Sequence, residues 1–359
     1  MKRLLPSLIL LLAIGNAMQA QQNSVYVDER TELMSIVFRL AGANEYVNKS
    51  VAKYNHEIDS TFKPFKTHAL IQYAKQLHEN DDVAYEAVMN YATLFEIEDD
   101  KISLKKGIAD NAFDSRWEKG SIEKFLQLLN VFYVESNFHA FYEQQKPLYN
   151  LIEKRLTETL QEVDFSWFEK YYRTNDNGKT ILIPGLNNGW RHYNNIIEYN
   201  DGHKDIYVII GIPEFDSLGY PVYSQNMMNI IMHEYNYLFC EPLVNEYYAQ
   251  MQENAEALYQ IVKNRMSQQL CEDARMMMYE TLVRTVEIRY LLSKWIDIKD
   301  VIKQQNSQGY LFVEPMIKLF KQYEVWRKHY VTLGDFMPEI VKCVNEFSVE
   351  KMQKQKKKF

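Results

Sequence analysis

Residues 231–239 read Ile-Met-His-Glu-Tyr-Asn-Tyr-Leu-Phe, one residue away from the zinc-binding pattern His-Glu-x-x-His. On a helix, that pattern puts two imidazoles one turn apart on one face, so that both can reach a single Zn²⁺. The Glu between them acts on the water that the metal binds. Here His233 and Glu234 are present, but Tyr237 stands at the position of the second His. What this stretch can bind or catalyse depends on that substitution.

The patterns on both sides of this stretch predict a mainly helical α+β fold. Ser224 is suited to cap the start of the signature helix, and Pro242 to end it because proline has no backbone N–H. Apolar residues recur at helical spacing in residues 32–41, 66–77, 84–94, 122–132 and 138–161 before it, and in residues 244–270, 272–295, 309–323 and 338–347 after it.

Two β-branched runs, residues 179–183 and 206–212, are the strand candidates. A turn cluster at residues 175–178 precedes the first run, and a loop rich in Pro, Gly and Asn separates the two. We expect the runs to pair antiparallel in a small sheet beside the signature helix. Residues 206–212 would form its edge strand and could hold an extended peptide by strand addition.

The first twenty residues have the layout of a secretory signal peptide. Lys2 and Arg3 precede an apolar run over residues 4–14, and small residues follow, with cleavage after Ala17 or Ala20 fitting equally well. The apolar run is too short for a stable membrane span, and no longer one follows. We therefore expect an exported protein, periplasmic or extracellular, with no membrane span.

Charge and cysteine content narrow the function classes. The formal net charge of −7 argues against general nucleic-acid binding, because an acidic protein repels the phosphate backbone. Residues 351–358 are basic, in contrast to the acidic chain as a whole. Short basic tails of this kind are usually solvated and have no specific function. Cys240, Cys271 and Cys343 allow at most one internal disulfide, and their spacing does not resemble a metal site.

Residues 228–244 resemble the central motif of domain-of-unknown-function family 4932, a group of exported bacterial proteins. That family has a His-Glu-x-x-His core, usually followed by Ser-Phe, a short step and Pro-Leu. Residues 32–42, 206–212 and 280–289 are similar to other parts of the same family, so the resemblance covers most of the mature chain. It implies a zincin-like core with the chemistry of glutamate-type zinc peptidases, the gluzincins, and no particular substrate.

Carried over residue by residue, the resemblance implies roles for four side chains. His233 matches the first zinc ligand, and Glu234 matches the general base that takes a proton from the metal-bound water. Glu280 matches the third ligand, a carboxylate from a later helix. Arg284, one turn beyond, could orient that carboxylate or meet developing negative charge. At Tyr237, the second ligand position, the match fails.

The departure at Tyr237 predicts a zinc site that is weakened or lost. A neutral phenol is a poor zinc ligand, and its ordinary pKa of ~10 keeps it protonated at neutral pH. One imidazole and one carboxylate fall short of the usual three protein ligands. Glu287 lies near the same helix face as Glu280 and is an alternative carboxylate. His192 and His203 are near the strand candidates and could supply a missing imidazole.

Two interpretations stay open. In the first, the protein is a degenerate zinc-peptidase-like pseudoenzyme, with weak or no catalysis, that keeps its cleft to bind a peptide or a partner protein. In the second, it is a working zinc metallohydrolase in which Tyr237 or another residue is the replacement ligand. A third possibility, a structural helical protein with a chance motif, would be favoured if Glu280 lay far from His233.

The expected domain organisation follows the chain order. Residues 1–20 form the signal peptide, residues 21–165 an N-terminal helical region, and residues 166–300 the zincin-like region with the small sheet, the signature helix and the third-ligand helix. Residues 301–359 add C-terminal helices and the basic tail, packed with the rest as one unit.

Overall fold

The computed structural model of the protein describes residues 24–47, 51–109, 112–161, 163–173, 179–212 and 214–347. The expected signal peptide, the turn cluster at 175–178 and the basic tail lie outside these residues. Within them the chain forms thirteen α-helices and two small sheets, so the predominantly helical α+β fold is confirmed. Among the described helices, none combines the length and the apolarity that a bilayer crossing needs.

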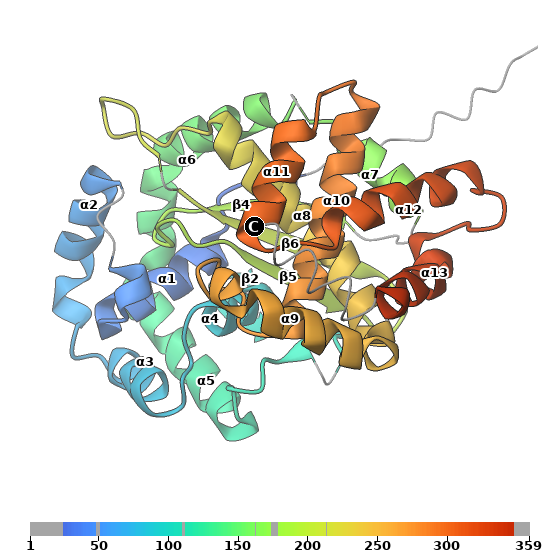
Figure 1. Ribbon diagram of the computed structural model, residues 1–359. Coiled ribbons are helices and arrows are strands. Elements are labelled where there is room, and N and C mark those ends of the chain that lie inside the picture. Colours follow the sequence, from blue (N-terminus) through green and yellow to red (C-terminus); the bar gives the residue numbers. More distant parts are fainter. Residues whose placement is uncertain are drawn as a thin grey trace, which may run out of the picture.

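A four-stranded mixed sheet lies at the centre of the molecule (Figure 1). Its strands, in spatial order, are β1 (Ser24–Val25), β4 (Lys179–Gly185), β6 (Lys204–Gly211) and β5 (Tyr193–Glu198). β4 and β6 run parallel, while β5 runs antiparallel to β6. A separate antiparallel hairpin joins β2 (Phe95–Glu98) to β3 (Lys101–Leu104).

Two expectations about this sheet are wrong. The two β-branched runs do not pair antiparallel, because β5 lies between them in the sequence and carries the chain back, so that β6 starts at the same end as β4. β6 is also not an edge strand, since β4 and β5 flank it on either side. Strand addition to residues 206–212 is therefore impossible, and β5 is the edge strand nearest the signature helix.

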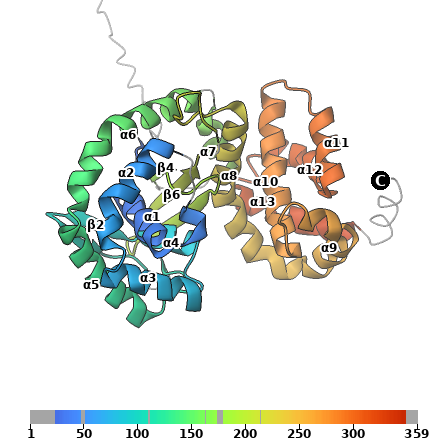
Figure 2. The same ribbon diagram turned by 90° about the vertical axis from the view of Figure 1, so that its left-hand side faces the viewer.

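The helices divide into two groups on either side of the signature helix α8 (Gln225–Tyr247), which lies between them in Figure 2. Before it come α1 (Glu29–Ala41), α2 (Ala52–Phe62), α3 (Ala69–Asn80), α4 (Glu86–Thr93), α5 (Lys119–Glu135), α6 (Phe138–Leu160) and α7 (Phe165–Tyr172). After it come α9 (Gln252–Ser267), α10 (Ala274–Ser293), α11 (Lys299–Gln308), α12 (Val313–Val325) and α13 (Leu333–Glu346).

The start of α8 is as expected, but its end is not. The Ser224 side chain caps the helix by accepting a hydrogen bond from the Met227 backbone N–H. Pro242 lies inside α8 instead of ending it. A proline removes one backbone N–H, and here the tertiary packing of the next turn, where Val244 is buried, holds the helix together. The expected helix over residues 244–270 is accordingly split between α8 and α9.

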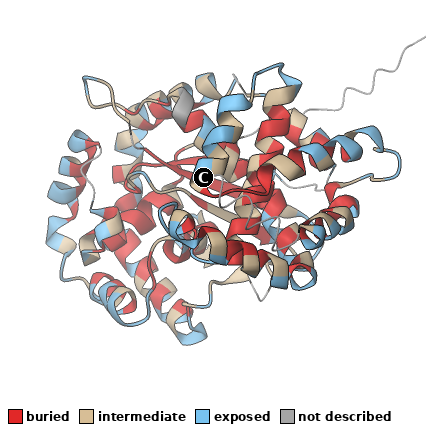
Figure 3. Cartoon of the chain, viewed as in Figure 1, coloured by how far each residue is buried: buried red, intermediate tan, exposed pale blue. Residues whose placement is uncertain are grey.

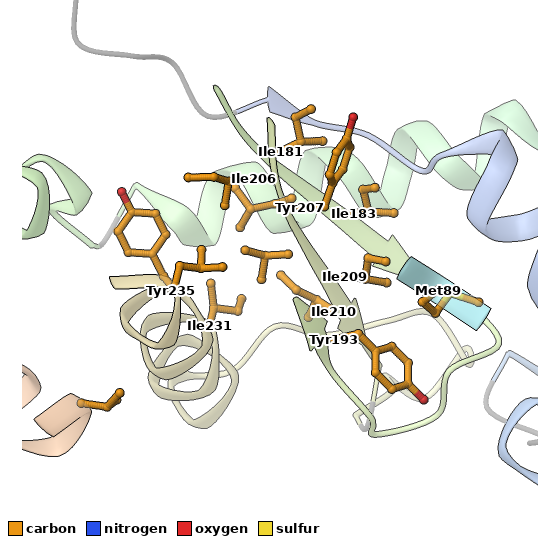
Figure 4. Packing of buried hydrophobic residues seen from close by; sticks show 14 of the residues in the cluster. Met89, Ile181, Ile183, Tyr193, Ile206, Tyr207, Ile209, Ile210, Ile231 and Tyr235 are labelled. Atoms are coloured by element: carbon orange, nitrogen blue, oxygen red, sulfur yellow. The ribbon is translucent and has the colours of Figure 1, made fainter. Parts of the chain in front are cut away.

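The buried face of α8 packs on the central sheet (Figure 4). Ile231 and Tyr235 of α8 lie on the same side of the sheet as Ile206 and Ile210 of β6, and all four are buried. Tyr207 of β6 points to the other face. Figure 3 shows the two inner strands, β4 and β6, buried over most of their length, and this two-sided burial explains why β6 is a continuous apolar run.

All three cysteines are unbridged. Cys240 and Cys271 are buried and Cys343 is half-buried. The single disulfide that the composition allows is therefore not formed.

Candidate functional site

Two neighbouring helices supply the predicted site residues. α8 carries His233, Glu234 and Tyr237, and α10 packs against it and carries Glu280 and Arg284. His233 Nε2 lies 3.5 Å from Glu280 Oε2. The two helices therefore bring together residues nearly fifty positions apart. The condition that would have favoured a chance motif, a large separation of these two residues, is not met.

A second carboxylate approaches the imidazole from the same helix. Glu287 Oε1 lies 3.1 Å from His233 Nδ1, so each ring nitrogen faces a carboxylate of α10. Arg284 Nη1 is also 3.5 Å from Nδ1, but the shorter contact to Glu287 sets the direction of the Nδ1 proton. The sequence indicated Glu287 only as an alternative to Glu280. In the structure, both carboxylates contact His233.

Glu280 is the centre of the arrangement. Arg284 Nη2 lies 2.9 Å from its Oε2, an ion pair across one turn of α10. The Tyr237 hydroxyl donates a hydrogen bond to its Oε1 at 3.1 Å. The Arg284 guanidinium also lies over the Tyr310 ring, 4.3 Å from the ring centroid. Glu280 therefore has a hydrogen-bond donor at Oε1 and a cationic partner at Oε2, although the buried Oε2 receives no hydrogen bond from the described residues.

The electrostatics follow from these contacts. Burial opposes a charge on His233, but Glu287 and Glu280 outweigh it and raise its pKa to about 10. Burial likewise opposes a charge on Glu280, but His233 and Arg284 outweigh it and lower its pKa to about 2. These carboxylates therefore favour the imidazolium form of His233 at neutral pH. We call these four residues, with two positive and two negative charges, the His233 network.

The His233 network does not fit a zinc ion. A metal takes the lone pair of a neutral imidazole nitrogen, whereas both ring nitrogens of His233 face carboxylates, and these raise its pKa and so favour the protonated ring. The carboxylate expected as third ligand is paired with Arg284. Within the described part of the chain, no group of three or more His, Cys, Asp or Glu side chains is arranged to hold a metal ion.

Tyr237 is a hydrogen-bond donor in this site. Burial, followed by the charge of Glu280, raises the pKa of the Tyr237 hydroxyl far above its ordinary value. The phenolate that would ligate a metal is therefore strongly disfavoured. The side chain lies at the position expected of the second ligand and contacts the expected third ligand directly.

Glu234, the predicted base, is held by the edge strand. Its Oε2 accepts a hydrogen bond from Asn194 Nδ2 of β5 at 2.8 Å. Burial raises the pKa of Glu234, while the His233 charge and the Asn194 hydrogen bond lower it, with burial dominant. Sequence reasoning missed β5 and Asn194. The turn at residues 201–202 just before β6 was the available signal, because it predicts a hairpin partner on its other side.

The two other histidines behave differently. His192 lies just before β5; burial, and then the charge of His233, lower its pKa to about 4. Its buried Nδ1 has no hydrogen-bond partner. His203 lies in the β5–β6 turn, stacked on Tyr199 and paired with Asp201. Only His192 is therefore close enough to the His233 network to influence it.

A groove opens beside the network on the side of the sheet. It has a volume of about 220 Å³ and runs between β5 and α8. We call it the β5–α8 groove, and its lining includes Asn194, Ile196, Tyr237, Leu238 and Glu241.

Comparison with known proteins places the chain in a family. No curated protein and no solved structure matches it. The family model described as domain of unknown function DUF4932 matches residues 23–343. That range includes α8, α10 and every residue of the His233 network. The chain therefore belongs to the DUF4932 family.

Proposed function

We propose that this protein is an exported, zinc-peptidase-like protein that has lost zinc and catalysis and uses its cleft to bind a peptide or a partner protein. The observation that carries the proposal is the closed His233 network, in which each imidazole nitrogen faces a carboxylate and Arg284 is paired with Glu280. Export rests on the basic, apolar and small-residue layout of residues 1–20.

The network accounts for the loss of hydrolytic chemistry. Zinc-dependent hydrolysis needs a metal that polarises water and a carboxylate that takes the proton from it. In this chain a guanidinium occupies the partner position on Glu280, and an imidazolium has no lone pair to offer. Glu234 keeps the residue type of a base but is tied to Asn194.

The zincin-like character of the core is part of the proposal. An antiparallel edge strand beside the signature helix supports it, as does a second helix that brings a carboxylate to the signature histidine. In this proposal the binding cleft is the β5–α8 groove, because β5 is the edge strand of the sheet at that place. An extended peptide could add to this edge by backbone hydrogen bonds.

The alternative is an active zinc metallohydrolase with a replacement ligand, and one observation favours it. His192 is a buried imidazole whose low pKa keeps it neutral, and its Nδ1 lacks a partner. A lone pair of that kind suits a metal. This alternative requires His233 to leave at least one of its two carboxylates.

Metal analysis separates the two. The mature chain, purified without a chelator and dialysed against micromolar Zn²⁺, is expected to retain far less than one zinc per chain. It is also expected to leave a mixed peptide library uncut. Stoichiometric zinc that disappears in both His233→Ala and His192→Ala, together with cleavage, would establish the metallohydrolase instead. His203→Ala is the matched control, because that histidine lies outside the site.

A further inference from the structure

We propose that the β5–α8 groove accepts a lysine or arginine side chain of the bound peptide. This inference rests on the proposed function, since it takes the groove as the binding cleft, and adds the chemical class of the residue that enters it. Three features of the groove support it: its polar groups are hydrogen-bond acceptors, its negative charge has no cationic partner among the described residues, and its walls are apolar.

The accessible polar groups of the groove are acceptors. Asn194 donates a hydrogen bond from Nδ2 to Glu234, so it offers no free donor there. Glu241 presents a carboxylate, which only accepts when ionised. The Tyr237 hydroxyl already donates its one hydrogen bond to Glu280, so it can only accept a further one. A lining of acceptors is complementary to a donor-rich group such as an ammonium or a guanidinium.

The negative charge in the groove also favours a cationic ligand. Burial raises the pKa of Glu241, and an Asn245 hydrogen bond lowers it; no cation contributes. Among the described residues, none of the basic side chains forms a salt bridge with Glu241. Arg284 of the His233 network is paired with Glu280, and the Arg275 guanidinium lies over the Tyr248 ring. A cationic ligand would supply the positive partner that the Glu241 carboxylate lacks. The protein's net charge of −7 favours the approach of such a ligand.

The walls suit the stem of a long basic side chain. Leu238 and Pro242 of α8 and Ile196 of β5 line the groove, and Leu238 is buried. Lysine and arginine bury their methylene stems against such surfaces while the charged head reaches polar groups. A volume of about 220 Å³ has room for one such side chain.

The strand beside the groove can hold the peptide backbone. The Glu198 carbonyl of β5 accepts a hydrogen bond from the Ala109 N–H, outside the sheet. Because successive residues of a strand alternate, Ile196 presents its own backbone groups to that same outer side. Ile196 therefore combines a free edge position with a place in the groove wall.

The test uses the full mature chain and three matched five-residue peptides, acetylated and amidated. Their sequence is Ala-Leu-X-Leu-Ala, in which X is lysine, norleucine or glutamate. Isothermal titration calorimetry should show the lysine peptide binding at least tenfold more tightly than the norleucine peptide, and the glutamate peptide binding most weakly. Glu241→Gln should remove most of the lysine preference. Glu246→Gln, which changes an equally exposed glutamate of the same helix outside the groove lining, should keep it.

A second variant guards against a folding artefact. Ile196→Lys places a tethered ammonium in the groove, so it should abolish lysine-peptide binding while circular dichroism shows an intact fold. The proposal is overturned if the lysine peptide fails to bind at millimolar concentration, if it binds no better than the norleucine peptide, or if its preference survives Glu241→Gln.

Mass spectrometry of the recovered peptides keeps the two proposals apart. Cleaved peptide would overturn the non-catalytic function and leave the lysine preference untouched. Intact peptide bound without regard to X would overturn the lysine site and leave the non-catalytic binding function standing.

Discussion

The Tyr237 hydroxyl donates a hydrogen bond to Glu280 Oε1 across 3.1 Å. The residue that departs from the His-Glu-x-x-His pattern is thus a direct partner of the carboxylate expected as a metal ligand. Arg284 forms an ion pair with the other oxygen, Oε2, which is buried and receives no hydrogen bond from the described residues. The substitution is therefore part of a consistent local arrangement, in which a hydrogen bond and an ion pair take the place of coordination.

Tyr237→Phe should destabilise the protein by about 1 kcal/mol. The change removes the hydrogen bond to Glu280 but leaves the ring, and a hydrogen bond to a charged group contributes about 1.5–3 kcal/mol, reduced here because Arg284 still holds the carboxylate. Urea denaturation measures the free energy of unfolding. Tyr330→Phe, which removes a hydrogen bond at the surface, is the control and should change it by less than about 0.5 kcal/mol. Equal effects of the two variants would mean that the Tyr237 hydrogen bond is not made.

Tyr237→His alone should not restore a stoichiometric zinc site, although it completes the motif. The new imidazole would face a Glu280 that is still paired with Arg284 and a His233 that is still protonated. Adding Arg284→Met should raise zinc binding at least tenfold over the single variant, because it frees Glu280 as a ligand. Zinc titration followed by calorimetry gives both values. Tight binding by the single variant would contradict the account.

Arg284→Met should destabilise the protein by about 3 kcal/mol. It leaves Glu280 and Glu287 facing one imidazolium in a buried site, and removing one partner of a buried ion pair typically costs about 3–5 kcal/mol. Lys318→Met is the matched control, because Lys318 and Glu314 form the same i,i+4 pair on α12 but are largely exposed. Its effect should stay below about 0.5 kcal/mol. If both variants unfold at the same urea concentration as the parent, the His233 network does not stabilise the fold.

The stability of the protein should fall between pH 6.5 and pH 10. The pKa of His233 is raised from 6.5 to about 10 on folding, so its contribution is complete below pH 6.5 and is lost as the pH rises through about 10. Glu280 behaves oppositely, since its pKa falls from 4.5 to about 2 and its contribution is lost only as the pH drops through about 2.

His233→Gln should flatten this pH dependence. Urea midpoints measured at half-unit steps between pH 5 and pH 10 would show the parent losing stability across the alkaline half and the variant losing much less. Curves of equal slope would assign the alkaline loss to other groups.

The local features of the site were predictable from the sequence. Ser224 caps α8 because a serine before an apolar helical pattern acts within one turn of the chain. The proximity of His233 and Glu280 followed from the family resemblance, which carries information about distant contacts that periodicity lacks.

What was missed depends on tertiary contacts. In β5, Asn194 donates a hydrogen bond to Glu234 and Asn195 donates one to Thr93. These two consecutive asparagines make the segment polar, so its sequence does not look like a strand. Pro242 is tolerated inside α8 because the packing around it outweighs one lost backbone hydrogen bond. The role of Arg284 as counter-ion could not be seen either, since it depends on where α8 and α10 place their side chains.

The most direct test of the account is the protonation state of His233, read from its ring ¹⁵N chemical shifts at pH 8, with His233→Gln used for assignment. The account predicts two protonated ring nitrogens at pH 8, unchanged by one equivalent of Zn²⁺. A neutral ring with one unprotonated nitrogen, or a shift to a metal-bound nitrogen when zinc is added, would contradict it.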